Sequence, residues 1–294
     1  MGDKKMSKKK KLFTLFLAMT VVFTMCFAAV PAYAASGTAI TNADELKAMS
    51  ANGNYYLAND IEVPANLILF TSYDTPFTGT LDGNGHAIKG YTYTASADWT
   101  EQAALFGYAK KATFKNLKMS NVNISLNQAG TVAALVAASE NCKFTDISVS
   151  GKIVGKSLNT AAGIVAYSYA GGTLTNCKNS ADITITNADE GSDAAGVAGF
   201  IGSAGSMKNC SNSGNISISG SIEASSISAA GVVLSVGKTT SCKNSGTISV
   251  SAIGSGSMND ECIAAGVAVE VETAVSCSNT GKISMNATID ATKA

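Results

Sequence analysis

Polar and apolar residues alternate in a tract that recurs four times in the second half of the chain. The tract has the form C-x-N-x-[AG]-x-I, and the alternation continues past its last residue, as in Ile183-Thr-Ile185-Thr186. A period of two is that of a β-strand, so Cys, Asn, Ala or Gly and Ile should share one face, and Lys, Ser, Thr and Asp the other. The four copies begin at Cys177, Cys210, Cys242 and Cys277.

A second tract, Ala-Gly followed by apolar residues, repeats in step with the first. Its five copies are Ala129-Gly130, Ala162-Gly163, Ala195-Gly196, Ala230-Gly231 and Ala265-Gly266, with glycine spacings of 33, 33, 35 and 35 residues. A unit of this length with two or three short strands cannot bury its apolar face alone, but stacked coils pairing at about 4.8 Å can. The helical repeats of similar length, ankyrin and tetratricopeptide, have apolar positions at helical spacing that are missing here. Residues 103–294 are therefore predicted to form a parallel β-solenoid with coils of about 33 residues.

The cysteines fall into two groups. Ile147 and Leu117 occupy the equivalent place in earlier coils, which makes the Cys position a core position and predicts an internal stack of buried free thiols. Cys142 and Cys262 lie outside this register and are predicted to be loop cysteines. No C-x-x-C pair or His-Cys cluster is present, so we expect no metal site.

The asparagines of the first tract are predicted to point inward. Buried amides need hydrogen-bond partners. Stacked side chains could bond one another or the backbone of a turn; the alternative is a row of amides that binds a ligand. The residues are Asn179, Asn212, Asn244 and Asn279.

Residues 35–102 are predicted to be an N-terminal cap with the first coils. The segment from Thr41 to Met49 predicts a short helix with Asn42 as its N-cap and Glu45 three residues on. Residues Asn54 to Ile61 predict a strand, and Phe77 to Ile88 predict a strand, a tight Gly-rich turn and another strand. A cap over the open first coil would prevent end-to-end association.

The segment Phe77-x-Gly79-x-Leu81-Asp82-Gly83-x-Gly85-His86-x-Ile88, followed by Leu105-Phe106-Gly107, resembles the opening coil of secreted right-handed parallel β-helix proteins. The Ala-Gly tracts resemble GLUG-type repeats, which occur in bacterial surface proteins, adhesins and some immunoglobulin A peptidases. The resemblance covers about residues 40–294. It implies an all-β, right-handed parallel β-helix of adhesin-like type. The last Gly of the GLUG pattern survives only in Val197-Ala198-Gly199.

Residues 1–34 are predicted to be a bacterial secretory signal peptide, cleaved between Ala34 and Ala35. Six lysines precede the apolar run from Leu12 to Val30, and an A-x-A pattern closes it. A membrane anchor is the alternative, because the run is long enough to span a bilayer. No second apolar span follows, so the mature chain is expected to be secreted, extracellular or associated with the cell surface.

Charge argues against two classes of partner. Removal of the signal would leave 15 lysines against 20 acidic residues, a net charge of −5, and the chain contains no Arg. Nucleic acids and anionic lipids are therefore not expected partners.

The sequence contains few residues or motifs that are typical of catalytic sites. The resemblance includes polysaccharide lyases and hydrolases, which generally use Arg or Lys bases, calcium-binding carboxylates or clustered Asp with His and Arg. Asp82 and His86 could form an acid/base pair, but they also suit a turn in the cap. No H-E-x-x-H motif and no G-x-S-x-G motif beside a His is present. We assign no catalytic, cofactor-binding or metal-binding residue, and favour a chain that is not an enzyme.

Hydroxyl residues form three outward rows: Ser180, Ser213, Ser245 and Thr280; Thr184, Ser217, Ser249 and Ser284; Thr186, Ser219, Ser251 and Asn286. They could bind glycans, a protein edge or ordered water, or be only a solvated face. Loops near Asp189-Glu190, Asp193 and Asp260-Glu261 are candidate contact points. The prediction is a non-catalytic module for binding, adhesion or scaffolding, with a glycan or extracellular protein as partner. A polysaccharide lyase or glycoside hydrolase is the second hypothesis, and an ice-binding protein the third. Self-association through the C-terminal coil is also expected, unless Asp290 and Lys293 blunt that end.

Overall fold

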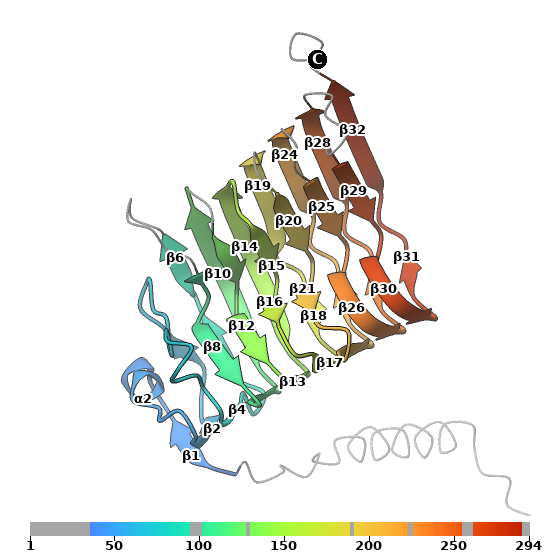
Figure 1. Ribbon diagram of the computed structural model, residues 1–294. Coiled ribbons are helices and arrows are strands. Elements are labelled where there is room, and N and C mark those ends of the chain that lie inside the picture. Colours follow the sequence, from blue (N-terminus) through green and yellow to red (C-terminus); the bar gives the residue numbers. More distant parts are fainter. Residues whose placement is uncertain are drawn as a thin grey trace, which may run out of the picture. The chain divides into compact units, whose positions relative to one another are not determined.

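The structure is a computed structural model that describes residues 36–94, 102–127, 130–188, 191–222, 226–254 and 261–289. The predicted signal peptide, and with it the N-terminal prediction of export, lies outside the described residues. Residues 36 onward form one compact unit, a parallel β-solenoid in which the strands of the described ranges pair in parallel (Figure 1). No helix in the described ranges is long and apolar enough to cross a membrane.

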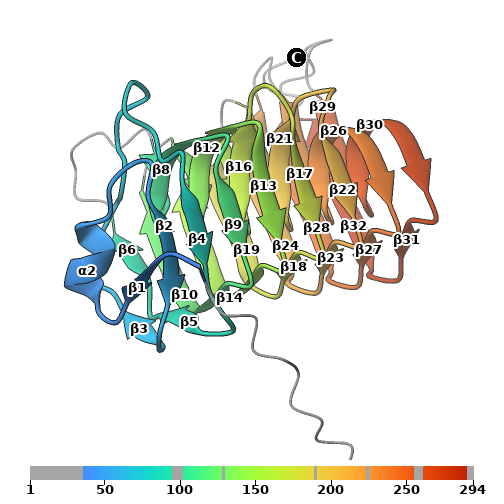
Figure 2. The ribbon, with the colours of Figure 1, turned by 90° about the horizontal axis from the view of Figure 1, so that it is seen from below.

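Three sheets run along the solenoid, and from β4 onward the coils contribute strands to all of them (Figure 2). The first sheet contains β1 (Thr38–Ile40), β2 (Asn54–Leu57), β4 (Thr80–Asp82), β8 (Phe106–Lys110), β9 (Thr113–Lys115), β12 (Val136–Glu140), β13 (Cys142–Thr145), β16 (Val165–Ser168), β17 (Gly172–Thr175), β21 (Ala198–Ile201), β22 (Ser206–Lys208), β26 (Val233–Thr240) and β30 (Ala268–Val275). We call it sheet A. The long strand β26 pairs with both β21 and β22 and so joins its two halves.

Sheets B and C complete the coil. Sheet B contains β3 (Ile61–Glu62), β5 (Ala87–Lys89), β6 (Thr92–Thr94), β10 (Lys118–Leu126), β14 (Ser148–Lys156), β18 (Lys178–Asn179), β19 (Asp182–Ala188), β23 (Ser211–Asn212), β24 (Ile216–Ile222), β27 (Lys243–Asn244), β28 (Ile248–Gly254), β31 (Ser278–Asn279) and β32 (Ile283–Ile289). Sheet C contains β7 (Gln102–Ala103), β11 (Thr131–Ala133), β15 (Thr160–Ala162), β20 (Ser192–Ala195), β25 (Ser226–Ala230) and β29 (Glu261–Ala265).

The turn from sheet A to sheet B uses the left-handed backbone conformation once per coil. Asn and Asp tolerate this conformation better than most residues because their side chains bond the local backbone. The corner residues have φ between 50° and 56° and are Asn116, Asp146, Asn176, Asn209, Ser241 and Ser276. Each corner therefore sets the direction in which the following C-x-N tract enters sheet B.

The apolar interior follows the predicted columns. The thiols of Cys177, Cys210 and Cys242 are buried below Leu117 and Ile147, as the alternation predicts. In the first coils the same interior is filled by aromatic rings, among them Phe114 and Phe144, whose ring centroids lie 5.3 Å apart at 6°.

Two cysteine predictions are wrong. Cys142 is the first residue of β13 and is fully buried, and Cys262 belongs to β29. Neither lies in a loop. Burial raises the pKa of the Cys142 thiol to about 11. Cys142 is a free thiol, so it is not bonded to Cys262.

The asparagines form a continuous ladder. Asn179 donates from Nδ2 to Oδ1 of Asn212 at 2.8 Å, and Asn212 does the same to Asn244 at 2.8 Å. Asn244 continues to Asn279 at 2.7 Å. Each Nδ2 also donates to the backbone carbonyl two residues on, as Asn212 does to Gly214 at 2.8 Å. Both predicted ways of satisfying the amides therefore operate together.

The register of the first Ala-Gly tract differs from the expectation. Gly130 does not align with Gly163; instead the backbone N–H of Ala134 donates to the carbonyl of Gly163, and Val136 pairs with Val165. Ala133-Ala134 is thus the true counterpart of the later Ala-Gly pairs. The physical reason is that Val149, rather than an Asn, stands beside Asn179 in that coil.

The N-terminal end has the predicted helix. Helix α2 (Ala43–Lys47) begins after Asn42, whose side chain accepts from the backbone N–H groups of Asp44 and Glu45. Leu46 of this helix is fully buried in the main core. The predicted strands after it are β2, β4 and β5, and the Gly-rich turn between β4 and β5 is a coil corner, because β4 belongs to sheet A and β5 to sheet B.

Candidate functional site: an aromatic and acidic trough on sheet A

Asp82 and His86 do not form an acid/base pair. The Asp82 carboxylate accepts from the Asn84 backbone at 2.8 Å and from Asn116 Nδ2 at 3.0 Å, and pairs with Lys115 at 3.1 Å. Burial raises the pKa of this carboxyl, but these bonds outweigh it and hold the pKa below its usual value. His86 Nδ1 lies 3.6 Å from Asp60 Oδ1 instead. Both residues therefore brace the first coils.

The first hydroxyl row is engaged in the solenoid itself. Ser180 Oγ donates to the carbonyl of Val149 in the preceding coil at 3.0 Å, and Ser213, Ser245 and Thr280 make the equivalent bond at 3.3 to 3.4 Å. The second row is in register, with Thr184 beside Ser217 and Ser249 beside Ser284. The third row is broken, because a register shift separates Thr186 from Ser219.

The acidic residues predicted to lie in contact loops fall into two groups. Three lie outside the described residues: Asp189, Glu190 and Asp260. Asp193 is not in a loop but in β20, where its Oδ1 is buried without a hydrogen-bond partner. Glu261 begins β29 and is exposed.

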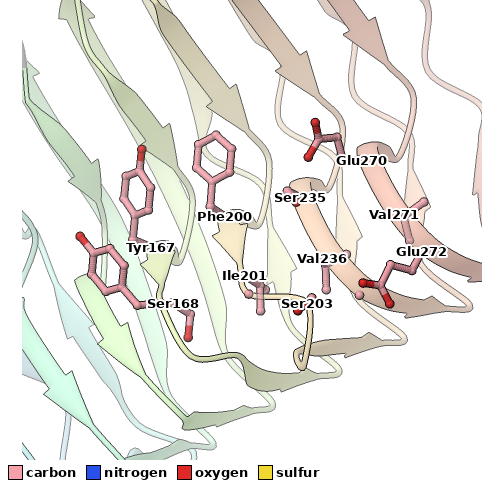
Figure 3. Close-up of a pocket in the computed structure, with 13 residues that line it drawn as sticks. Tyr167, Ser168, Phe200, Ile201, Ser203, Ser235, Val236, Glu270, Val271 and Glu272 are labelled. Carbon is pink, nitrogen blue, oxygen red and sulfur yellow. The ribbon is translucent and has the colours of Figure 1, made fainter.

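A trough on the outer face of sheet A has the most distinctive chemistry in the described part of the chain (Figure 3). Its volume is about 620 Å³. One column of paired residues crosses it, one residue from each of four successive coils: Tyr167, Phe200, Ser235 and Glu270. Aromatic rings thus stand at one end of the trough and a carboxylate at the other.

The aromatic wall is built from stacked rings. Tyr167 and Phe200 have centroids 5.1 Å apart at 18°, and Tyr167 and Tyr169 have centroids 5.7 Å apart at 13°. Tyr167 Oη lies 2.9 Å from Thr160 Oγ1 of sheet C. Its ring also packs on a small cluster of buried alanines that includes Ala162 and Ala166. These contacts hold the ring in place.

Tyr169 differs from Tyr167 because 63% of its surface is exposed. Its pKa is raised, first by partial burial and then by the neighbouring phenols of Tyr167, Tyr108 and Tyr73. The Tyr73 and Tyr108 rings meet edge to face at 5.8 Å, and a smaller hollow beside them is also lined by Tyr169. The aromatic surface therefore extends from the trough toward the first coils.

The floor and the acidic wall complete the trough. Small residues line the floor, namely Gly202, Ser203, Ser235 and Gly237. Glu270 and Glu272 project from β30 and are exposed. Neither carboxylate has an ion pair or hydrogen bond with another residue in the described ranges.

The sequence does not reveal this trough through a repeated residue type. The signal that could have found it is positional, since Tyr167, Phe200, Ser235 and Glu270 each stand four residues after the glycine of an Ala-Gly tract. In the described residues, no cluster of three or more His, Cys, Asp or Glu side chains could hold a metal ion.

Comparison with known proteins supports the fold. No protein-family model matches the chain, and no curated protein matches it. Among solved structures it is similar to that of a "putative immunoglobulin A1 protease from Bacteroides ovatus", with a TM-score of 0.53 and 18% identity. The match covers 87% of this chain and 85% of the other. At this identity the likeness shows the shared β-helix fold.

Proposed function

We propose that this protein is a secreted or cell-surface, non-catalytic β-solenoid module of adhesin-like type that binds an extracellular ligand in the trough of sheet A. The observation that carries the proposal is the wall of stacked aromatic rings on an outer face. Aromatic side chains normally enter the interior, as Phe114 and Phe144 do. An exposed group of rings marks a contact surface for another molecule.

The ligand classes that fit are glycans and extracellular proteins. Aromatic side chains contribute a large, rigid contact area at low entropic cost. The hydroxyls of Ser203 and Ser235 and the carboxylates of Glu270 and Glu272 supply polar partners around it. The trough is shallow and open, which suits a flat or extended ligand.

The test is a binding screen of the purified protein against a glycan array and against extracellular-matrix proteins. Tyr169→Ala should weaken binding about tenfold or more while leaving the fold intact, because the side chain is largely exposed. Thr184→Ala, on the outer face of sheet B, is the matched control and should bind as the parent does. If no ligand binds, or if Tyr169→Ala binds as well as the parent, the proposal fails.

A polysaccharide lyase or glycoside hydrolase is the second candidate. Glu270 and Glu272 lie two residues apart on one face of β30, so both carboxylates border the same trough. Paired carboxylates carry out glycoside hydrolysis. Assays on acidic and neutral glycans, with and without calcium, decide between the two: turnover that is lost in Glu270→Gln would replace the binding proposal.

The ice-binding hypothesis is third. It rests on the in-register second hydroxyl row, and thermal hysteresis of the purified protein would support it.

A further inference from the structure

The half-buried Phe200 ring has one face covered by another ring and one face that no ring covers among the described residues. Tyr167 covers it from the preceding coil, at 5.1 Å and 18°. The next residue in the column is Ser235, which is too small to cover the other face, although the ring also packs against a buried cluster that includes Ala230 and Leu234 of that coil. That face of the ring therefore borders the trough (Figure 3).

The opposite wall lies two coil steps from Phe200. Ser235 pairs with Glu270, and coils repeat at about 4.8 Å, so the backbone positions of Phe200 and Glu270 are about 10 Å apart. A planar group in contact with a ring needs about 3.5–4 Å on its near side. The remaining width of about 6 Å lets a carboxylate approach a cationic group as its ion-pair partner.

Charge then selects the class of group. Glu270 and Glu272 lack a cationic partner in the described residues, and the chain contains no Arg at all. Apart from Glu270 and Glu272, no residue that lines the trough carries a charge. An occupant that neutralises the acidic wall must bring its own positive charge.

We propose that the trough binds an arginine side chain of an extracellular polypeptide, stacked on Phe200 and ion-paired with Glu270 and Glu272. This inference rests on the proposed function and names its ligand class. A guanidinium group is planar and stacks on aromatic faces, and it also presents a fork of N–H donors that matches a carboxylate.

Other ligands would make fewer favourable interactions with the aromatic ring and the two carboxylates. A lysine ammonium is a compact, strongly hydrated charge that cannot stack as a plane. A neutral glycan leaves both carboxylates uncompensated, and an acidic glycan is repelled by them. The binding should therefore follow the order arginine, lysine, then neutral analogue.

The experiment measures binding of a capped octapeptide with two arginines, separated by Gly and Ser, to the purified protein by calorimetry. Peptides in which lysine or the neutral isostere citrulline replaces arginine are the matched probes. We expect the arginine peptide to bind at least about tenfold more tightly than the citrulline peptide, and its affinity to fall as salt is raised. Equal affinity for the two peptides, or no binding of the arginine peptide, overturns the inference.

Variants locate the site. Glu270→Gln combined with Glu272→Gln should weaken arginine-peptide binding about tenfold or more, whereas Glu261→Gln, on β29 of the same coil, should have no effect. Ser235→Phe should abolish binding by extending the ring column into the trough. It tests filling of the site while Phe200, Glu270 and Glu272 stay in place, and an unchanged unfolding midpoint shows that the fold survives. Parent-like binding by these trough variants contradicts the inference.

The outcomes also separate this inference from the proposal it rests on. If a neutral glycan binds in the screen and needs Tyr169, while the arginine peptide does not bind, the binding module stands and its ligand is a glycan. If neither binds, both fail.

Discussion

The Asn212 side chain connects three coils through one amide group. Its Oδ1 accepts from Asn179, and its Nδ2 donates to Asn244 and to the carbonyl of Gly214. The residue is only 1% exposed, so water cannot replace these partners. Burial of an amide is tolerated here because both N–H groups and the carbonyl oxygen have hydrogen-bond partners.

Asn212→Ala should therefore be costly. It removes an acceptor from Asn179 and a donor from Asn244 and from Gly214. Unsatisfied buried groups cost about 1–3 kcal/mol each, so we expect the free energy of unfolding to fall by roughly 2–4 kcal/mol. Urea unfolding followed by circular dichroism measures it. Asn286→Ala, exposed on β32, is the control and should change the free energy of unfolding by less than about 0.5 kcal/mol.

Asp193 predicts a pH dependence of stability. Burial raises the pKa of its carboxyl to about 6, although a hydrogen bond with Ser228 partly opposes this. The folded chain thus binds this proton more tightly than the unfolded chain, whose Asp pKa is about 3.9. The stability that protonated Asp193 contributes is fully present below about pH 4, and it is lost as the pH rises through about 6 and the buried carboxyl ionises.

Asp193→Asn should remove that dependence. At pH 8 the variant should be more stable than the parent by about 1–2 kcal/mol, and the difference should shrink as pH falls toward 4. Unfolding midpoints measured across this range check it, and Glu261→Gln, exposed in the same sheet, should follow the parent. A difference that grows as pH falls would contradict the raised pKa.

At the scale of elements, the Ala-Gly tract and the C-x-N tract of each coil pack against each other. A Cβ added to Gly196 would lie 2.4 Å from Asn212 Cγ and 2.2 Å from the carbonyl oxygen of Gly231. Gly231 stands in the same relation to Asn244. Where the ladder has not yet begun, Ala134 replaces the glycine and Val149 replaces the asparagine. The glycine column therefore leaves room both for the asparagine ladder and for the carbonyl oxygen of the next coil.

A double-mutant cycle tests this pairing. Gly196→Ala alone should destabilise the protein by about 1–3 kcal/mol, because the added methyl group overlaps the Asn212 side chain. In an Asn212→Ala background the same change should cost at least about 1 kcal/mol less. Additive effects would show that the glycine is needed only for the backbone contact to Gly231.

The interior columns could be predicted from sequence because each coil places a buried apolar residue at the same position. Leu117, Ile147 and the cysteines all fill one position, so the alternation alone assigns them. The register of Gly130 could not be predicted by matching residue types, since alanine is the sterically allowed substitute where no Asn is present. The trough could not be predicted from the sequence, because no residue type repeats along it. Its column changes residue type in every coil, and Tyr169 follows the end of β16 and so lies outside the strand pattern.

At the scale of the whole molecule, the two ends of the described solenoid differ. Helix α2 and its buried Leu46 pack against the first coils (Figure 1). In the last coil, Ile283 is 42% and Met285 is 55% exposed, whereas Ile248 and Val250 above them in the same columns are buried. Among the described residues, no strand pairs with the far edges of β29 to β32.

This asymmetry leads us to propose that two copies associate through their last coils. Among the described residues, each copy offers strand edges with no partner, an apolar surface and an Asn279 amide whose Nδ2 donates to Gly281 alone. The helix at the other end disfavours head-to-tail growth, so a closed dimer is expected rather than a filament.

Sedimentation analysis over a concentration series should show a monomer–dimer equilibrium. Met285→Lys should shift it toward monomer, because a lysine facing its own copy across a two-fold axis is both buried and repelled. Lys243→Ala, exposed one coil earlier, should leave it unchanged. A parent protein that stays monomeric at high concentration would contradict the proposal.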